Sequence, residues 1–167
     1  MLLRLIFLLG LSLAIISCSK NEALYTPTEK LDPYETYKEG LSAFQNNQFF
    51  FASKKFTEAE INFTSPSASA KAAIMASFSL YAINFYSEAE ENLLRYLKNY
   101  PSDKNKVYAN YLLAIISYEQ IGDEKHDLKP LLQAKEKIDF FLKEYPNSEY
   151  AIDLRLKKDL VTNQFAA

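Results

Sequence analysis

The chain has little of the chemistry that enzymes commonly use. Its 167 residues include one cysteine, one histidine, no tryptophan and only three scattered glycines. One histidine and one cysteine cannot supply a Ser-His-Asp triad or a histidine-based metal site, and scattered glycines form no phosphate-binding loop. One cysteine also excludes an internal disulfide. We therefore expect a protein that is not an enzyme, with no catalytic residue, no metal, no cofactor and no small-molecule substrate.

Charge of either sign is in no large excess. The 19 basic and 21 acidic residues leave a net charge of -2. Such a balance predicts no electrostatic attraction to nucleic acid or to an anionic membrane surface. Carboxylates gather at Glu58 and Glu60 and again at Glu88, Glu90 and Glu91. We interpret them as solvated helix faces rather than as a general acid and base pair.

Long hydrophobic runs are limited to the start of the chain. After Arg4, residues 5–16 are almost all apolar. A membrane-spanning helix needs about 20 apolar residues, whereas a positive flank followed by a short apolar run is typical of a secretory signal peptide. We predict that residues 1–17 are a signal peptide that is removed.

The only cysteine lies directly after this run. The sequence Ile-Ile-Ser-Cys that ends at Cys18 resembles the bacterial lipobox, which implies lipidation of Cys18. Several acyl chains hold a protein on a membrane that a single chain would let go. The resemblance favours the outer membrane and its periplasmic face, because Ser19 stands where many inner-membrane lipoproteins have aspartate. The alternative is an ordinary signal peptide with an incidental cysteine. In the first case residues 18–31 form a polar tether.

Residues 32–167 are predicted to form one all-α domain. Asp32 can cap a helix that Pro33 begins. A helix, a short break and a second helix then recur three times, which is the signature of a helical array. The predicted pairs cover about 33–66, 68–101 and 105–146, and one further helix covers 148–165. Ser102-Asp103 and Asn147-Ser148 are expected to cap the helices that follow them.

These repeats resemble the tetratricopeptide repeat, in which small residues let two helices approach and large residues fill the gap. The second-helix alanines Ala52, Ala89 and Ala134 lie 37 and 45 residues apart, against a usual spacing of about 34. The third pair contains an insertion, Gly122 to Pro130, which is either a neutral surface loop or a partner-binding loop. The matching positions are Gly40, Phe49, Ala52, Phe56 and Ala59; Ser77, Tyr86, Ala89, Leu93, Tyr96 and Pro101; and Ala114, Ala134, Ile138, Phe141 and Pro146.

The order of these features resembles the BamD family, lipoproteins of the outer-membrane β-barrel assembly machinery. The resemblance rests on the lipobox and tether, Tyr-x-x-Gly at 37–40, LLRYLKNYP at 93–101 and FLKEYPNSEYA at 141–151. It implies a scaffold that captures unfolded outer-membrane proteins and contacts other subunits of the machinery, including the barrel-forming one. About three of the family's five repeats are matched. We expect either a C-terminally truncated chain or packing of residues 147–167 on something outside it.

The resemblance also implies where a client would bind. In tetratricopeptide arrays the first helix of each pair lines a concave groove, and here those helices are rich in aromatics. Tyrosine suits such a surface because it covers apolar groups while its hydroxyl stays polar. The groove-facing positions are Tyr34, Tyr37, Leu41 and Phe44; Ile74, Phe78 and Tyr81; and Tyr108, Tyr111, Ile115 and Tyr118. The aromatic members are the candidate client-binding residues, although the same helices must pack on their neighbours and half of the set can equally be core.

A second hypothesis needs no client. In it the chain is a tetratricopeptide scaffold lipoprotein that organises cell-envelope or peptidoglycan enzymes. The two hypotheses differ in one expectation, because only the first predicts that a peptide from the last strand of an outer-membrane protein binds to the aromatic groove.

Overall fold

Seven helices account for the regular structure of the described residues, which are 32–122 and 128–165 of the computed structural model. No strand occurs among these residues, so the predicted all-α class is confirmed. They belong to the unit Leu31–Ala167. The predicted signal peptide, Cys18, the tether and His126 lie outside the described residues. The helices are α2 (Pro33–Gln45), α3 (Phe49–Asn62), α4 (Pro66–Tyr81), α5 (Tyr86–Asn99), α6 (Lys106–Glu119), α7 (Leu128–Glu144) and α8 (Ala151–Phe165).

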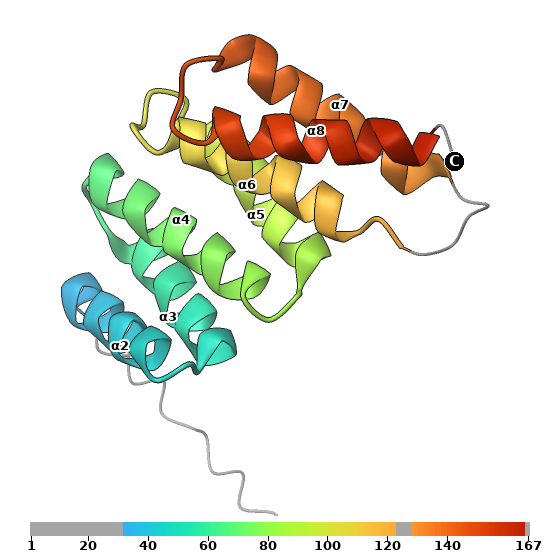
Figure 1. Ribbon diagram of the computed structural model, residues 1–167. Helices are drawn as coiled ribbons and strands as arrows, with labels where there is room; N and C mark the ends of the chain where they lie inside the picture. The colour runs from blue at the N-terminus through green and yellow to red at the C-terminus, as the bar shows by residue number, and fades with distance from the viewer. Residues whose placement is uncertain (1–31, 123–127, 166–167) are drawn as a thin grey trace, which may run out of the picture. The chain divides into compact units, whose positions relative to one another are not determined.

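Each helix packs against the next one in the chain (Figure 1). The turns between α2 and α3 and between α4 and α5 lie at one edge of this stack. The loops that join α3 to α4, α5 to α6 and α7 to α8 lie at the opposite edge (Figure 1). This is a tetratricopeptide-like array of three antiparallel pairs and one further helix, as the sequence predicts. None of the described helices combines the length and the apolar character needed to cross a membrane.

Helix starts follow the capping rules only in part. The Asp32 side chain accepts the Tyr34 amide at 2.9 Å and Pro33 is the first helical residue, which confirms the predicted start of α2. The prediction that Ser102-Asp103 caps the first helix of the third pair is wrong, because Asn105 is the residue that precedes α6. Asp103 instead accepts the Asn105 amide at 2.9 Å and the Tyr96 hydroxyl at 2.5 Å. The Asp103 carboxylate, which the sequence predicts as a helix cap, is therefore held by the Tyr96 side chain of α5.

The last two helix starts also differ from the sequence prediction. Helix α8 begins at Ala151, and the buried Ser148 hydroxyl has no hydrogen-bond partner among the described residues, so it does not cap that helix. Helix α7 begins at Leu128, so the predicted surface insertion does not extend to Pro130. A proline is tolerated in the first turn of a helix because the amides there have no intrahelical acceptor.

The positions that match the tetratricopeptide pattern form the contacts between helices. Gly40 is buried, and a Cβ atom added to it would lie 2.8 Å from the ring of the fully buried Phe56. The glycine therefore sets how closely α2 and α3 approach. The other interior positions of the pattern are all fully buried: Ala52, Ala59, Ser77, Ala89, Leu93, Tyr96, Ala114, Ala134, Ile138 and Phe141.

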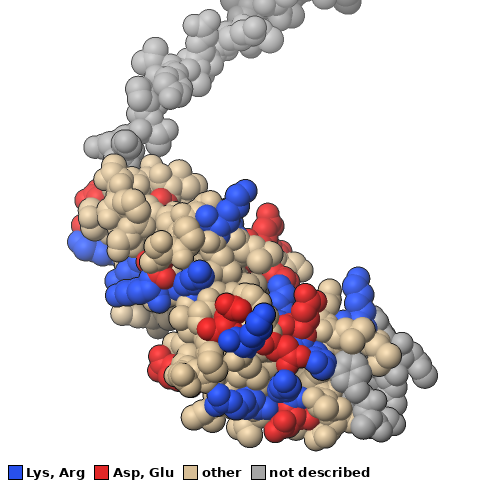
Figure 2. Space-filling view, turned by 90° about the horizontal axis from the view of Figure 1, so that it is seen from above, with Lys and Arg blue, Asp and Glu red and all other residues tan. Residues whose placement is uncertain are grey.

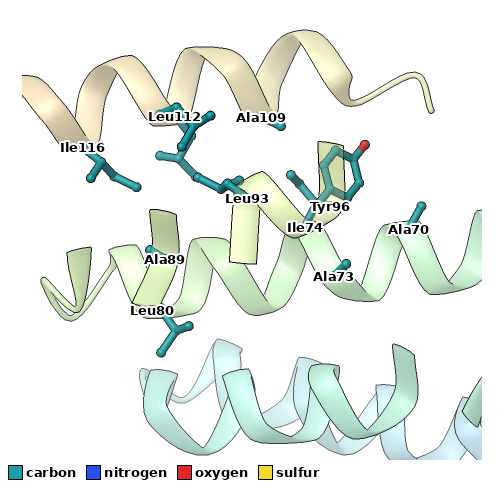
Figure 3. Close-up of a cluster of buried hydrophobic side chains, with 11 residues drawn as sticks. Ala70, Ala73, Ile74, Leu80, Ala89, Leu93, Tyr96, Ala109, Leu112 and Ile116 are labelled. Atoms are coloured by element: carbon teal, nitrogen blue, oxygen red, sulfur yellow. The ribbon is translucent and has the colours of Figure 1, made fainter. Parts of the chain in front are cut away.

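The core is continuous from pair to pair. One cluster lies between α2, α3 and α4, a second joins α4, α5 and α6, and a third joins α6, α7 and α8. In the middle cluster Leu93 and Tyr96 of α5 lie between side chains of α4 and α6 (Figure 3). Burying each large side chain contributes about 1.5–3 kcal/mol, and here that burial depends on the neighbouring pair.

Helix α8 leaves an apolar stripe uncovered by the described residues. Ala151, Leu154 and Val161 pack into the third cluster, whereas the other side of the helix exposes Ile152 and Leu156. Their exposed fractions are 68% and 63%, and Leu160, one turn further, is also exposed. The expected uncovered face is therefore present, while what covers it stays a prediction.

Candidate binding surface

The first helices of the pairs bring most of the predicted aromatics into one connected set. Phe44 of α2 contacts Phe78 of α4 with ring centroids 5.7 Å apart, and Phe78 contacts Tyr108 of α6 at 6.5 Å. Tyr108 in turn contacts Tyr150, just before α8, at 5.8 Å. We call these four residues the aromatic column. Each of the four is partly exposed, so the column has a solvent-accessible side.

Two further predicted residues flank the column. Tyr81 lies 5.9 Å from Phe78, and Tyr111 lies 6.3 Å from Tyr108. Tyr111 also stacks on Tyr150 at 4.5 Å with an interplanar angle of 21°. Its hydroxyl donates a hydrogen bond of 2.9 Å to Asp153 of α8. This pair of contacts fixes the position of the Tyr111 ring.

The remaining predicted aromatics stand apart from the column. Tyr34 is 60% exposed and contacts Phe63 edge-on at 5.0 Å. Tyr37 packs on the buried Phe56 at 5.1 Å. Tyr118, at the far end of α6, lies under the Lys157 ammonium, 5.2 Å from its ring centroid. None of these three shares a ring contact with the column.

Three residues change the groove that the sequence predicts. Ile74 and Ile115 are 7% and 5% exposed and belong to the core clusters, because they turn toward the second helices rather than toward solvent. Tyr150 is not among the predicted groove positions, yet it extends the column. The Tyr-Pro-Asn-Ser-Glu-Tyr stretch at 145–150 offered no periodic signal for this, because Tyr150 precedes α8.

Tyrosine hydroxyls are protonated at neutral pH, because their ordinary pKa is about 10, and burial raises the pKa of several tyrosines of this surface further. Burial raises the pKa of Tyr108 to about 12, with smaller contributions from the neighbouring Tyr150 and Tyr81. Burial and then the hydrogen bond to Asp153 raise the pKa of Tyr111 as well. Burial is also the main cause of the raised pKa of Tyr37 and Tyr81. These side chains are therefore neutral hydrogen-bonding groups at physiological pH.

Charges of both signs are mixed among the described residues, and some of them form ion pairs. On the face shown in Figure 2, Lys and Arg side chains are interspersed with Asp and Glu, and no broad region of one sign is visible. Examples are the ion pair of Lys137 with Glu90 at 3.2 Å and that of Lys157 with Asp153 at 2.9 Å. Across residues 32–122 and 128–165 no group of His, Cys, Asp and Glu is arranged to hold a metal ion.

One carboxylate departs from the predicted solvated face. The Glu60 side chain is only 4% exposed and forms two hydrogen bonds with the Arg95 guanidinium, at 2.5 and 2.7 Å. The Tyr100 hydroxyl donates a third, at 3.1 Å. Glu60 lies on α3, Arg95 lies on α5 and Tyr100 directly follows α5. The network therefore joins the second helices of two successive pairs. Spacing along one helix could not reveal it.

The fold and the column define a class of protein, the tetratricopeptide-like helical scaffold, in which stacked helix pairs present a surface for another molecule. Comparison with known sequences gives the family. The chain belongs to the YfiO family, described as outer membrane lipoproteins, which it matches over residues 29–167. The predicted family resemblance is thereby confirmed, and the family is one of scaffolds rather than enzymes.

Two relatives carry the same name. The outer membrane protein assembly factor BamD of Caulobacter vibrioides is 33% identical over 130 residues, which are 78% of this chain and 43% of that protein. The outer membrane protein assembly factor BamD of Rickettsia prowazekii is 28% identical over 130 residues, which are 78% of this chain and 52% of that protein. The chain spans about half the length of these relatives.

Proposed function

We propose that this chain acts in the assembly of outer-membrane β-barrel proteins and binds unfolded client segments along the aromatic column. In this proposal a lipid on Cys18 holds the chain at the periplasmic face of the outer membrane, and a barrel-forming subunit receives the client. Support comes from the family match and from relatives named as outer membrane protein assembly factors.

The observation that carries the proposal is the spacing of the column. Its successive ring centroids are 5.7, 6.5 and 5.8 Å apart. An extended strand rises about 3.3 Å per residue and turns alternate side chains to one face, so side chains on one face recur about every 6.6 Å. Successive rings of the column can therefore contact alternate residues of an extended segment, one residue per ring.

Outer-membrane barrel strands have the matching pattern. Their lipid-facing side chains are apolar and alternate with polar side chains that face the barrel interior. Before the barrel forms, such a segment has an apolar side that water solvates poorly. The half-buried rings of Phe78 and Tyr108 would cover that side. The Tyr111 hydroxyl already donates to Asp153 and can still accept a hydrogen bond from a backbone N–H of the segment.

Contacts with other subunits have a candidate location at the far end of the array. The stripe of Ile152, Leu156 and Leu160 on α8 is exposed among the described residues. Apolar stripes of this kind are covered by another helix in stacked repeats. In the proposal the stripe packs against further repeats of a longer chain or against a neighbouring subunit.

A peptide-binding measurement tests the proposal. A fluorescent peptide from the last strand of an outer-membrane protein is titrated with the processed chain, residues 18–167, carrying Cys18→Ser. We expect Phe78→Ala to weaken binding by about tenfold or more, since buried aromatics dominate interfaces. Tyr111→Ala is expected to act in the same direction, and Tyr111→Phe separates the ring from the hydroxyl.

Phe140→Ala is the matched control. Phe140 is 50% exposed on α7, outside the column, so its loss should leave peptide binding unchanged. Circular dichroism shows whether each variant is folded. No binding to the unsubstituted chain, or equal binding by the folded Phe78 and Phe140 variants, would contradict the proposed client role and favour a scaffold that organises envelope enzymes.

A further inference from the structure

Two turns of the array share an unusual backbone conformation. Asn47, between α2 and α3, and Asn84, between α4 and α5, have φ angles of 58° and 62°. Each turn is closed by the amide of the next residue, which donates to a carbonyl five residues earlier: Gln48 to Ala43 at 2.8 Å and Phe85 to Leu80 at 3.0 Å. Asparagine is one of the few residues that adopt this left-handed conformation readily. The chain therefore starts α3 and α5 in equivalent ways.

The equivalent turns bring exposed aromatic side chains together. Phe50 at the start of α3 and Phe85 just before α5 are 51% and 41% exposed, and their rings lie 6.1 Å apart. Phe51 beside them is 48% exposed. We call these three residues the phenylalanine edge. Its position is the edge of the stack that carries the turns between α2 and α3 and between α4 and α5 (Figure 1).

Lysine ammonium groups lie over two of the three rings. The Lys54 ammonium lies 4.7 Å from the centroid of Phe50, and that of Lys55 lies 5.7 Å from the centroid of Phe51. Lys55 also pairs with Glu39 at 2.7 Å. Aromatic rings flanked by lysine are typical of surfaces that enter the boundary between lipid headgroups and acyl chains. Such a contact needs no net positive charge, in agreement with the balanced charge of the chain.

We propose that the phenylalanine edge rests in the surface of the lipid bilayer and so orients the array. This inference depends on the proposed lipid anchor at Cys18. The segment from Cys18 to residue 31 spans at most about 46–50 Å when extended, whereas α2 is about 20 Å long. The anchored chain is therefore long enough to bring the far edge of α2 to the membrane. The edge sets orientation, because half-exposed rings bury much less apolar surface than an acyl chain does.

The absence of tryptophan makes a direct test possible. The processed chain is coupled through its single thiol, Cys18, to a maleimide lipid in phosphatidylethanolamine and phosphatidylglycerol vesicles. Tryptophan is introduced singly as Phe50→Trp or Phe85→Trp. Ser102→Trp is the control, since Ser102 is exposed in the loop that joins α5 to α6, at the opposite edge of the stack.

The expected result is a blue-shifted emission of Phe50→Trp and Phe85→Trp on vesicles and loss of most of their fluorescence when the acyl chains are brominated. Ser102→Trp should keep the emission of an exposed indole. Equal quenching of all three variants, or quenching of none, overturns the proposal.

The coupling separates this inference from the proposed function. Chemical attachment supplies the anchor whether or not Cys18 is lipidated in the cell, and the peptide titration reports on the column independently. Peptide binding without quenching removes only the membrane contact. Quenching without peptide binding removes only the client role.

Discussion

The buried ion pair between Glu60 and Arg95 offers the sharpest prediction about how the array holds together. Replacing Arg95 by methionine keeps the aliphatic part of the side chain and removes the guanidinium. The Glu60 carboxylate, 4% exposed, then keeps only the Tyr100 hydroxyl at 3.1 Å. Removing one member of a buried pair costs about 3–5 kcal/mol. Since the Arg95 side chain is 37% exposed, water can reach part of the site, and we expect about 2–3 kcal/mol.

The assay is urea unfolding followed by circular dichroism at neutral pH, with thermal unfolding as a second measurement. The expected loss corresponds to a melting temperature lower by about 6–9 °C for a domain of this size. Glu60→Met should cost less, because the freed guanidinium is partly solvated. The double variant should cost less than the two single changes combined, because an apolar pair leaves no unpaired buried charge.

A second ion pair provides the control. Lys38 and Glu35 approach to 2.6 Å, nearly the same distance as in the buried pair, but their side chains are 68% and 64% exposed. Lys38→Met should leave stability unchanged, because exposed pairs contribute little. The reasoning is refuted if Arg95→Met and Lys38→Met have equal effects, or if the effects of Glu60→Met and Arg95→Met are additive.

Three further predictions use the same unfolding assay. Gly40→Ala should destabilise by about 1–2 kcal/mol despite the better helix propensity of alanine, because the added Cβ meets the Phe56 ring at 2.8 Å; a gain in stability contradicts this packing. Asn47→Gly should stabilise and Asn47→Ala destabilise, each by up to about 1 kcal/mol, because φ at this residue is 58°; the reverse order argues against the left-handed turn. Burial alone would raise the pKa of Asp103, but hydrogen bonds from the Tyr96 hydroxyl and a backbone amide lower it below 3.8. The ionised Asp103 therefore contributes to the free energy of unfolding above that pH, and this contribution is lost as pH falls through the lowered pKa. Asp103→Asn should reduce the loss of stability at acid pH, and an unchanged loss would contradict this role.

The helical array was predictable because its determinants are local. The small residues Gly40, Ala52 and Ala89 recur with large residues three and four positions away, and this spacing decides which side of each helix is apolar. The start of α2 was predictable for the same reason, since Asp32 and Pro33 act on the amides next to them. The family resemblance used these same patterns together with their order along the chain.

The candidate surface was predictable only in part. Aromatics on first helices could be counted from sequence, but whether each ring faces solvent depends on how far neighbouring helices rotate and tilt. Ile74 and Ile115 share the spacing of the groove positions and yet are buried. Tyr150 lies outside any helix and still completes the aromatic column through its contacts with Tyr108 and Tyr111.

The all-α array of repeated pairs and the tetratricopeptide positions in its core can be predicted from sequence alone, because they depend on residues within a few helical turns of one another. The family resemblance adds only the order of these patterns along the chain. By contrast, the burial of Glu60 against Arg95, 35 residues away, and the contact of Phe50 with Phe85 at one edge become visible only in the folded chain. Contacts across such separations depend on the packing angle of whole helices, and no local pattern of residues encodes that angle on its own.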